Sequence, residues 1–232
     1  MSTPGSRTRT WRVASGLVAA GVLAVCAVLG LAGPASALTL PGDWYGYVVT
    51  GATYTSTTAD WTMPAVSCAT AGTYVSIWTG LDGYSSDTVE QIGAEAYCSG
   101  DTAEYYGWYE LYPGAAVDFS QTLKAGDSLQ ASVAYASSKF TLTLRNVTRG
   151  WTQTVTKVLS GAARSSAETV VQVPSTFTCL KPLTLAAFTG DTVDGSPLGS
   201  LHPVEGTGGN PDIVVSPVSG ETFTVSCRPA AG

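Results

Sequence analysis

The residues best suited to chemistry lie between Trp108 and Pro113, a stretch that reads Trp-Tyr-Glu-Leu-Tyr-Pro. In a β-strand, successive side chains point to opposite faces, so Trp108, Glu110 and Tyr112 would share one face. Two aromatic rings and a carboxyl group on one face do not make an ordinary core. This stretch therefore indicates one wall of a binding surface.

Three other strand-like segments carry side chains of the same kinds. If their faces belong to one sheet, they form a floor of carboxylates, amides and aromatic rings. The alternative is the solvated outer face of a half-exposed sheet, which shows the same alternation. By parity the shared faces hold Trp78 with Asp82, Gln91 with Glu95, and Glu168 with Gln172.

The first 37 residues differ from the rest of the chain. Arg7, Arg9 and Arg12 precede an uncharged apolar run, and Ala35-Ser36-Ala37 supplies the small residues that a signal peptidase needs. We expect residues 1–37 to be a secretion signal peptide cleaved after Ala37, and residues 38–232 to be one domain of an extracellular protein. The alternative is an uncleaved membrane anchor, since the run is long enough to span a bilayer.

The charge of the expected mature chain bears on its partners. Cleavage lowers the number of Lys and Arg from 11 to 8 and leaves all 17 Asp and Glu, so the net charge becomes −9. Such a surface repels phosphate backbones and disfavours a nucleic-acid partner. We expect a monomer without a stable membrane anchor.

Four cysteines follow the expected cleavage site. An even number in an oxidising compartment indicates two disulfides, and three pairings are possible. We favour Cys68 with Cys98 and Cys179 with Cys227, because each pair closes a local loop. A zinc site is the competing interpretation, but no two cysteines have a close-ligand spacing and His202 is the only histidine. We expect neither a metal nor a cofactor.

Short apolar or alternating runs, separated by turn signals such as Asp82-Gly83 and Asp194-Gly195, recur along the mature chain. No segment has a convincing helical period. The pattern predicts an all-β protein, an antiparallel β-sandwich, with a long loop from Gly190 to Pro211. The expected strands are 44–50, 53–61, 73–81, 88–97, 104–112, 128–136, 139–146, 151–158, 167–173, 183–188, 212–215 and 222–227.

A series of short motifs resembles the glutamic peptidases, also called eqolisins. The resemblance implies a concanavalin A-like sandwich of two curved sheets, a cleft for an extended polypeptide, and secreted endopeptidase activity at acid pH. The motifs are Trp44-x-Gly46-Tyr47, Trp61-x-x-Pro64, Trp78-x-Gly80-x-Asp82-Gly83, Gln91-x-Gly93, Trp108-Tyr109-Glu110-x-Tyr112-Pro113, Gly126-Asp127 and Ala167-Glu168.

In that family a glutamine and a glutamate hold the attacking water, with the glutamate as general base and the glutamine amide stabilising the oxyanion. The resemblance places the glutamine at Gln91. The glutamate belongs at the end of the pattern Ala-Glu-x-Ile-x-Glu, where this chain has Gln172. A carboxamide cannot accept and return a proton, so we expect proteolysis to be weakened or lost.

Two carboxylates could compensate. Glu168 points to the same side as Gln172 but lies about 13 Å along the strand, too far to replace it without a register shift. Glu110 resembles a family residue near the catalytic pair and could be recruited as the base, which would leave an active peptidase. Its alternative role is to hold neighbouring side chains by hydrogen bonds.

The aromatic residues and Asp82 have both functional and structural interpretations. We expect Trp78, Trp108 and Tyr112 to contact substrate, although aromatic packing would also explain them. Asp82 would support the Gln91 region or simply build a turn. A non-catalytic peptide- or carbohydrate-binding module is the main alternative from another class, and a glycosidase using Glu95 and Glu110 is a minor one.

Overall fold

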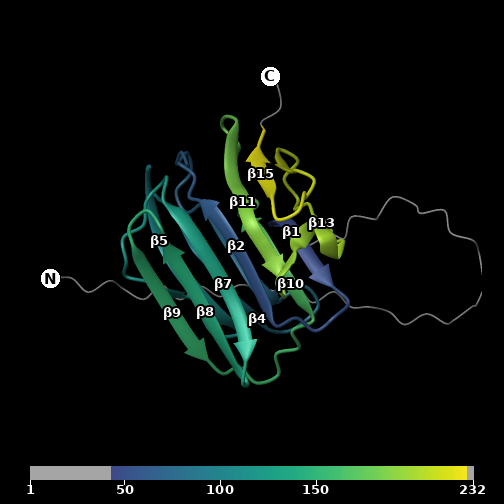
Figure 1. The fold of residues 1–232 in the computed structure, drawn as a ribbon. Coiled ribbons are helices and arrows are strands. Elements are labelled where there is room, and N and C mark those ends of the chain that lie inside the picture. The colour runs from purple at the N-terminus through teal and green to yellow at the C-terminus, as the bar shows by residue number, and fades with distance from the viewer. Residues whose placement is uncertain (1–42, 229–232) are drawn as a thin grey trace, which may run out of the picture.

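The computed structural model describes residues 43–228, which form a sandwich of two antiparallel sheets (Figure 1). This architecture confirms the predicted all-β sandwich. The expected signal peptide, residues 1–37, and the cleavage site after Ala37 lie outside the described residues. Within the described part of the chain, no helix is long and apolar enough to cross a membrane.

Seven strands form one sheet and eight form the other, and every pairing within them is antiparallel. The seven-stranded sheet has the order β13 (Val204–Gly206), β1 (Trp44–Thr50), β10 (Ser166–Gln172), β3 (Tyr74–Asp82), β4 (Val89–Ser99), β5 (Thr102–Tyr112) and β6 (Val117–Asp118). The eight-stranded sheet has the order β14 (Ile213–Val215), β15 (Phe223–Cys227), β11 (Leu183–Val193), β2 (Ser56–Thr62), β7 (Ser128–Ala136), β8 (Lys139–Asn146) and β9 (Trp151–Lys157), with β12 (Ser196–Pro197) paired to β11.

The main core lies between the two sheets and follows from strict alternation. In β7, Leu129, Ala131 and Val133 are buried while the residues between them are partly exposed. Leu142 and Leu144 repeat the pattern in β8. One apolar face per strand removes enough hydrocarbon from water to hold the sheets together.

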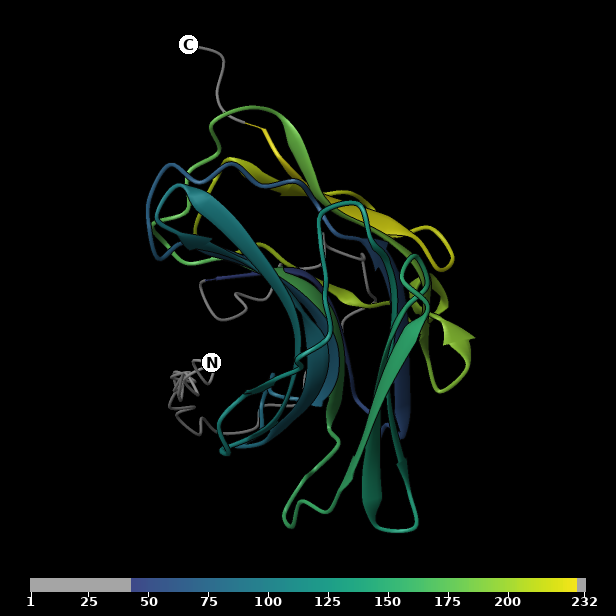
Figure 2. The ribbon, with the colours of Figure 1, turned by 90° about the vertical axis from the view of Figure 1, so that its left-hand side faces the viewer.

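The seven-stranded sheet is buried on both faces at its centre. Every residue of β10 is buried, and so are all those of β3 except Tyr74. Figure 2 shows that this sheet is strongly curved, with its hollow side turned away from the other sheet. We call this hollow side the concave face. It carries a second apolar cluster of its own, which contains Trp44, Val48, Trp78, Val89, Trp108 and Val170.

The segment from Gly190 to Pro211 corrects a prediction. It is not a long loop: β11 continues to Val193, a turn at Asp194-Gly195 leads into β12, and a short 3₁₀ helix follows at Leu198–Leu201. Val204–Gly206 then pairs with the edge of β1. Gly and Pro content predicted a loop because composition does not register the long-range hydrogen bonds that an edge strand receives.

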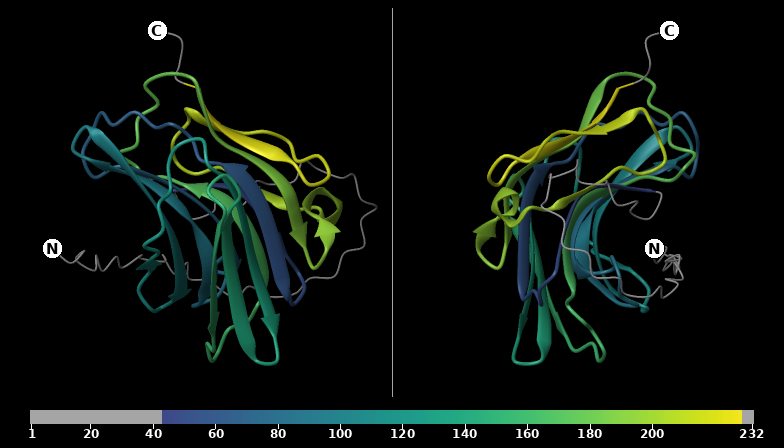
Figure 3. Two further views of the ribbon diagram at one scale, coloured as in Figure 1. Left: turned by 60° about the vertical axis from the view of Figure 1, so that its left-hand side comes forward. Right: turned by 90° about the vertical axis from the view of Figure 1, so that its right-hand side faces the viewer.

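Two disulfides join Cys68 to Cys98 and Cys179 to Cys227, the pairing favoured from loop size. The second bond ties the loop before β11 to the end of β15. Figure 3 shows the C-terminal strands, in yellow, beside β11, with which β15 pairs.

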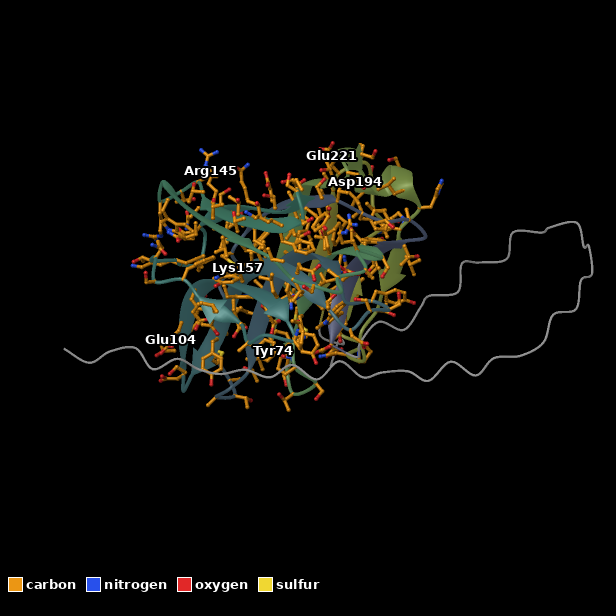
Figure 4. The ribbon with its side chains drawn as sticks, turned by 90° about the horizontal axis from the view of Figure 1, so that it is seen from below. Tyr74, Glu104, Arg145, Lys157, Asp194 and Glu221 are labelled. Carbon is orange, nitrogen blue, oxygen red and sulfur yellow. A yellow bond between two sulfur atoms is a disulfide. The ribbon has the colours of Figure 1, made fainter. Side chains whose placement is uncertain are left out.

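Seen from below in Figure 4, Arg145, Asp194 and Glu221 lie along one side of the molecule, and Tyr74 and Glu104 lie along the opposite side.

Candidate active site

The register of β10, β3, β4 and β5 arranges the concave face in three cross-strand rows. Residues that are paired across antiparallel strands share a face, so each row projects its side chains on the same side. The first row is Glu168, Gly80, Gln91 and Glu110; the second is Val170, Trp78, Gly93 and Trp108; the third is Gln172, Ser76, Glu95 and Tyr106. These four strands therefore form one continuous sheet, and the residues that alternation groups together lie on the same face of it.

Gln91 and Glu110 are in direct contact. The Gln91 Nε2 donates to Glu110 Oε2 at 2.6 Å, and Glu110 is only 1 % exposed. Burial raises the pKa of Glu110 to about 7, although the hydrogen bond from Gln91 acts in the opposite direction. The second carboxyl oxygen of Glu110 and the Oε1 of Gln91 are buried and have no hydrogen-bond partner among residues 43–228. This pair has the polar groups that acid–base chemistry requires, and two buried oxygens still able to accept hydrogen bonds.

Gln172 is held by two different neighbours. Trp78 Nε1 donates to Gln172 Oε1 at 3.1 Å, and Gln172 Nε2 donates to Asp43 Oδ2 at 2.9 Å. An indole N–H only donates and a carboxylate only accepts, so these partners fix which end of the amide points each way. Burial raises the pKa of Asp43, and the hydrogen bond from Gln172 offsets part of that effect.

Gln91 and Gln172 share the concave face but do not touch. Gln91 pairs with Gly80 and Gln172 with Ser76, four residues apart on β3. Regular sheet geometry separates their backbones by roughly 13 Å along the strands and about 10 Å across them. Trp78 lies in the row between them. A group that bridges the two amides must therefore span this row.

Glu168 lies nearer to Gln91 in the register than Gln172 does. Both Glu168 and Gln91 flank Gly80, which has no side chain to separate them. Glu168 is 1 % exposed, and within the described part of the chain neither of its carboxyl oxygens has a partner with hydrogen-bond geometry. Burial raises its pKa well above the ordinary value, while Ser166 and the backbone of Tyr84 offset part of this. Burial therefore favours the neutral, protonated form of this side chain.

The aromatic residues predicted to contact substrate all lie on the concave face. Trp78 is fully buried and makes an edge-to-face contact with Trp44, with ring centroids 4.7 Å apart. Trp108 is 4 % exposed, and Tyr112 packs against the same cluster while remaining partly exposed. Trp78 therefore acts mainly through packing and through its bond to Gln172, while Tyr112 has the most open surface of the three.

Asp82 is fully buried at the end of β3, where it anchors a loop. Its carboxylate accepts the backbone N–H of Arg164 at 2.6 Å and that of Ser165 at 2.8 Å, and also the hydroxyls of Ser165 and Thr88. The Arg164 and Ser165 segment leads directly into β10. Asp82 thus holds the strand that carries Glu168 and Gln172 in place.

Sequence reasoning missed Asp43 and underrated Glu95. Asp43 carries no motif of its own, and its position next to Trp44 was the only signal available. Glu95 is 2 % exposed and accepts a 2.5 Å hydrogen bond from Tyr106. Across residues 43–228, no group of three or more His, Cys, Asp or Glu is arranged to hold a metal ion.

The fold and the site together define a class of protein, a β-sandwich with amide and carboxyl side chains across the hollow side of one curved sheet. Comparison with known protein families identifies the family to which the chain belongs. Residues 42–195 match the Peptidase A4 family, and the chain belongs to that family.

Individual relatives agree with this placement. Aspergillopepsin-2 from Aspergillus niger is 34% identical over an alignment of 142 positions that covers 51% of this chain and 49% of the relative, so the chain spans about half the length of that protein. The crystal structure of scytalido-glutamic peptidase with a transition state analog inhibitor has a TM-score of 0.68 and 25% identity, covering 82% of this chain and all of that one. Aspergilloglutamic peptidase from Aspergillus niger has a TM-score of 0.51 and 26% identity, covering 66% of this chain and 98% of that one.

Proposed function

We propose that this glutamic peptidase family protein is secreted, binds an extended polypeptide on its concave face, and cleaves it at acid pH more slowly than a glutamate at position 172 would allow. The cleavage is attack of water on a peptide bond. The observation that carries the proposal is the carboxamide of Gln172, held by Trp78 and Asp43 on the same sheet face as Gln91. A solved structure of scytalido-glutamic peptidase contains a peptide based transition state analog, which supports a peptide ligand for this chain.

The reduced rate follows from the chemistry of the amide. Gln172 can orient water or a carbonyl group by hydrogen bonds, but its amide neither accepts nor releases a proton at accessible pH. A general base positioned in the transition state contributes roughly 10²- to 10⁴-fold to the rate. We expect a loss in this range unless another carboxylate takes over part of the role.

Secretion is supported by the two disulfides, which persist in oxidising compartments, and by the signal-like sequence before residue 38. We propose cleavage after Ala37 and a single domain over residues 38–232. Mass spectrometry of protein recovered from the medium tests this directly, because an N-terminus at Leu38 is expected and an N-terminus at Met1 would contradict it.

Glu110 supports a second candidate, an active peptidase with a recruited base. It contacts Gln91 at 2.6 Å, and its pKa of about 7 makes it mostly protonated below pH 5. A protonated acid can donate to a leaving amine but cannot first accept a proton. This state favours the slow-peptidase proposal at acid pH and allows a faster Glu110-dependent reaction near neutrality.

The experiment compares cleavage of denatured casein between pH 2 and 8 by the mature wild-type protein, Gln172→Glu and Glu110→Gln. Slow cleavage in acid that Gln172→Glu raises at least tenfold supports the proposal. Gln153→Glu on the distant edge strand β9 adds the same charge and is the matched control, expected to behave as wild type. Brisk wild-type cleavage that Glu110→Gln abolishes would favour the recruited base. If neither the wild type nor Gln172→Glu cleaves casein, the peptidase proposal fails, and a glycan array then tests the carbohydrate-binding alternative.

A further inference from the structure

Asp43 lies beside the position where the family resemblance expects the catalytic carboxylate. Its Oδ2 accepts the Gln172 Nε2 hydrogen bond at 2.9 Å, and its backbone carbonyl accepts the N–H of Val173 at 3.1 Å. The second bond continues the β1–β10 ladder one residue beyond the Trp44–Gln172 pair. Asp43 is therefore fixed to the same strand end as Gln172, from two directions.

The pair contains one carboxylate and one carboxamide, and electrostatics favours that combination. With a glutamate at position 172, Trp78 would bond one oxygen and the other would face Asp43. Two carboxyl groups at hydrogen-bond distance cannot both ionise easily, and one pKa would rise strongly. The amide at Gln172 leaves Asp43 as the single ionisable group of the pair.

We propose that Asp43 is the proton-transfer group of this site and that the Gln172 amide orients it by a hydrogen bond. The catalytic carboxylate is then supplied by position 43 rather than by position 172. This deepens the proposed function and rests on it. In the reaction, the Asp43 carboxylate takes a proton from a solvent water as the water oxygen bonds to the scissile carbonyl carbon. Gln172 has a second N–H, which can donate to the oxyanion. The C–N bond then breaks as Asp43 returns the proton to the leaving nitrogen.

The surroundings of Asp43 suit this role. The residue is partly buried, so part of its surface is open to solvent. The charge of Asp43 acts on Tyr45, whose pKa is raised mainly by burial; Glu95 lies in the same cross-strand row as Gln172, two strands away from it. Neither is a cation, and among the described residues no ion pair holds Asp43 in its ionised form, while burial raises its pKa.

The test is a charge exchange between the two positions. Cleavage of casein across pH 2 to 6 is measured for wild type, Asp43→Asn, Gln172→Glu and the double variant, with exposed Asp101→Asn as the matched control. We expect Asp43→Asn to lose at least tenfold in kcat/KM and to lose the acid limb of the pH profile. The double variant, with the carboxylate back at 172, should exceed the wild type. Melting temperatures within a few degrees of wild type verify folding.

The outcomes separate this inference from the proposed function. If Gln172→Glu cleaves but Asp43→Asn matches the wild type within twofold and keeps its acid limb, Asp43 is not the proton carrier and the peptidase proposal stands. A wild type without measurable cleavage beside an active Gln172→Glu also overturns the role of Asp43. If the wild type, Gln172→Glu and the double variant all fail to cleave, the proposed function fails and the inference fails with it.

Discussion

Replacing Glu90 tests whether buried neutral acids adapt this fold to low pH. Glu90 is fully buried and points into the inter-sheet core, paired in register with Leu81 and Leu111. Neither of its carboxyl oxygens has a hydrogen-bond partner in the part of the chain that the structure describes. Burial, with a smaller contribution from the charge of Asp82, raises the pKa of Glu90 from 4.5 to about 8. The folded state therefore prefers the protonated form.

The sign and size of the effect on stability follow from the difference between the pKa of Glu90 in the folded and in the unfolded chain. Below pH 4.5 both the folded and the unfolded chain carry the protonated acid, so the stabilisation is complete. As the pH rises towards 8 the unfolded chain ionises first, and the stabilisation is lost. The gap between 4.5 and about 8 corresponds to roughly 5 kcal/mol at about 1.4 kcal/mol per pH unit, which is an upper bound.

Urea unfolding at pH 4 and pH 8, followed by tryptophan fluorescence, measures the free energy of unfolding. We expect the wild type to be more stable at pH 4, and Glu90→Gln to match it there but exceed it at pH 8 by several kcal/mol, about 10 °C or more in melting temperature. Glu104→Gln, on an exposed position of β5, is the matched control and should follow the wild type. Parallel curves for wild type, Glu90→Gln and Glu104→Gln would refute the reasoning.

Two other substitutions test how the site is positioned. Gly93→Ala places a Cβ 2.3 Å from the carbonyl oxygen of Ile77 and 2.5 Å from the Cβ of Trp78. We expect a loss of more than about 3 kcal/mol of stability, measured by urea unfolding, and a change below about 1 kcal/mol would show that the backbone of β3 can shift away from β4. Asp82→Ala removes the acceptor of four hydrogen bonds and should cost about 2–5 kcal/mol. Asp82→Asn should cost less, and a stable Asp82→Ala that loses only peptide binding would instead assign Asp82 to the substrate.

The sequence alone determined the class of fold and the composition of the concave face. Alternation along each strand fixes which side chains share a face, because it depends only on the local geometry of the backbone. Trp108, Glu110 and Tyr112 were correctly grouped in this way, while Tyr109 and Leu111 pack on the main core. The assignment of Gln172 to the family's glutamate position also comes from the sequence, because the family pattern is a linear one, and it stays a prediction.

The tertiary structure decided which polar groups meet. Alternation does not fix register, so only the pairing of β10, β3, β4 and β5 shows Gln91 against Glu110 and Gln172 against Asp43. Burial, and with it the raised pKa of Glu90 and Glu110, likewise depends on neighbours that are distant along the chain. Chemistry at this face depends on contacts between strands, and those contacts exist only once the sheet has formed.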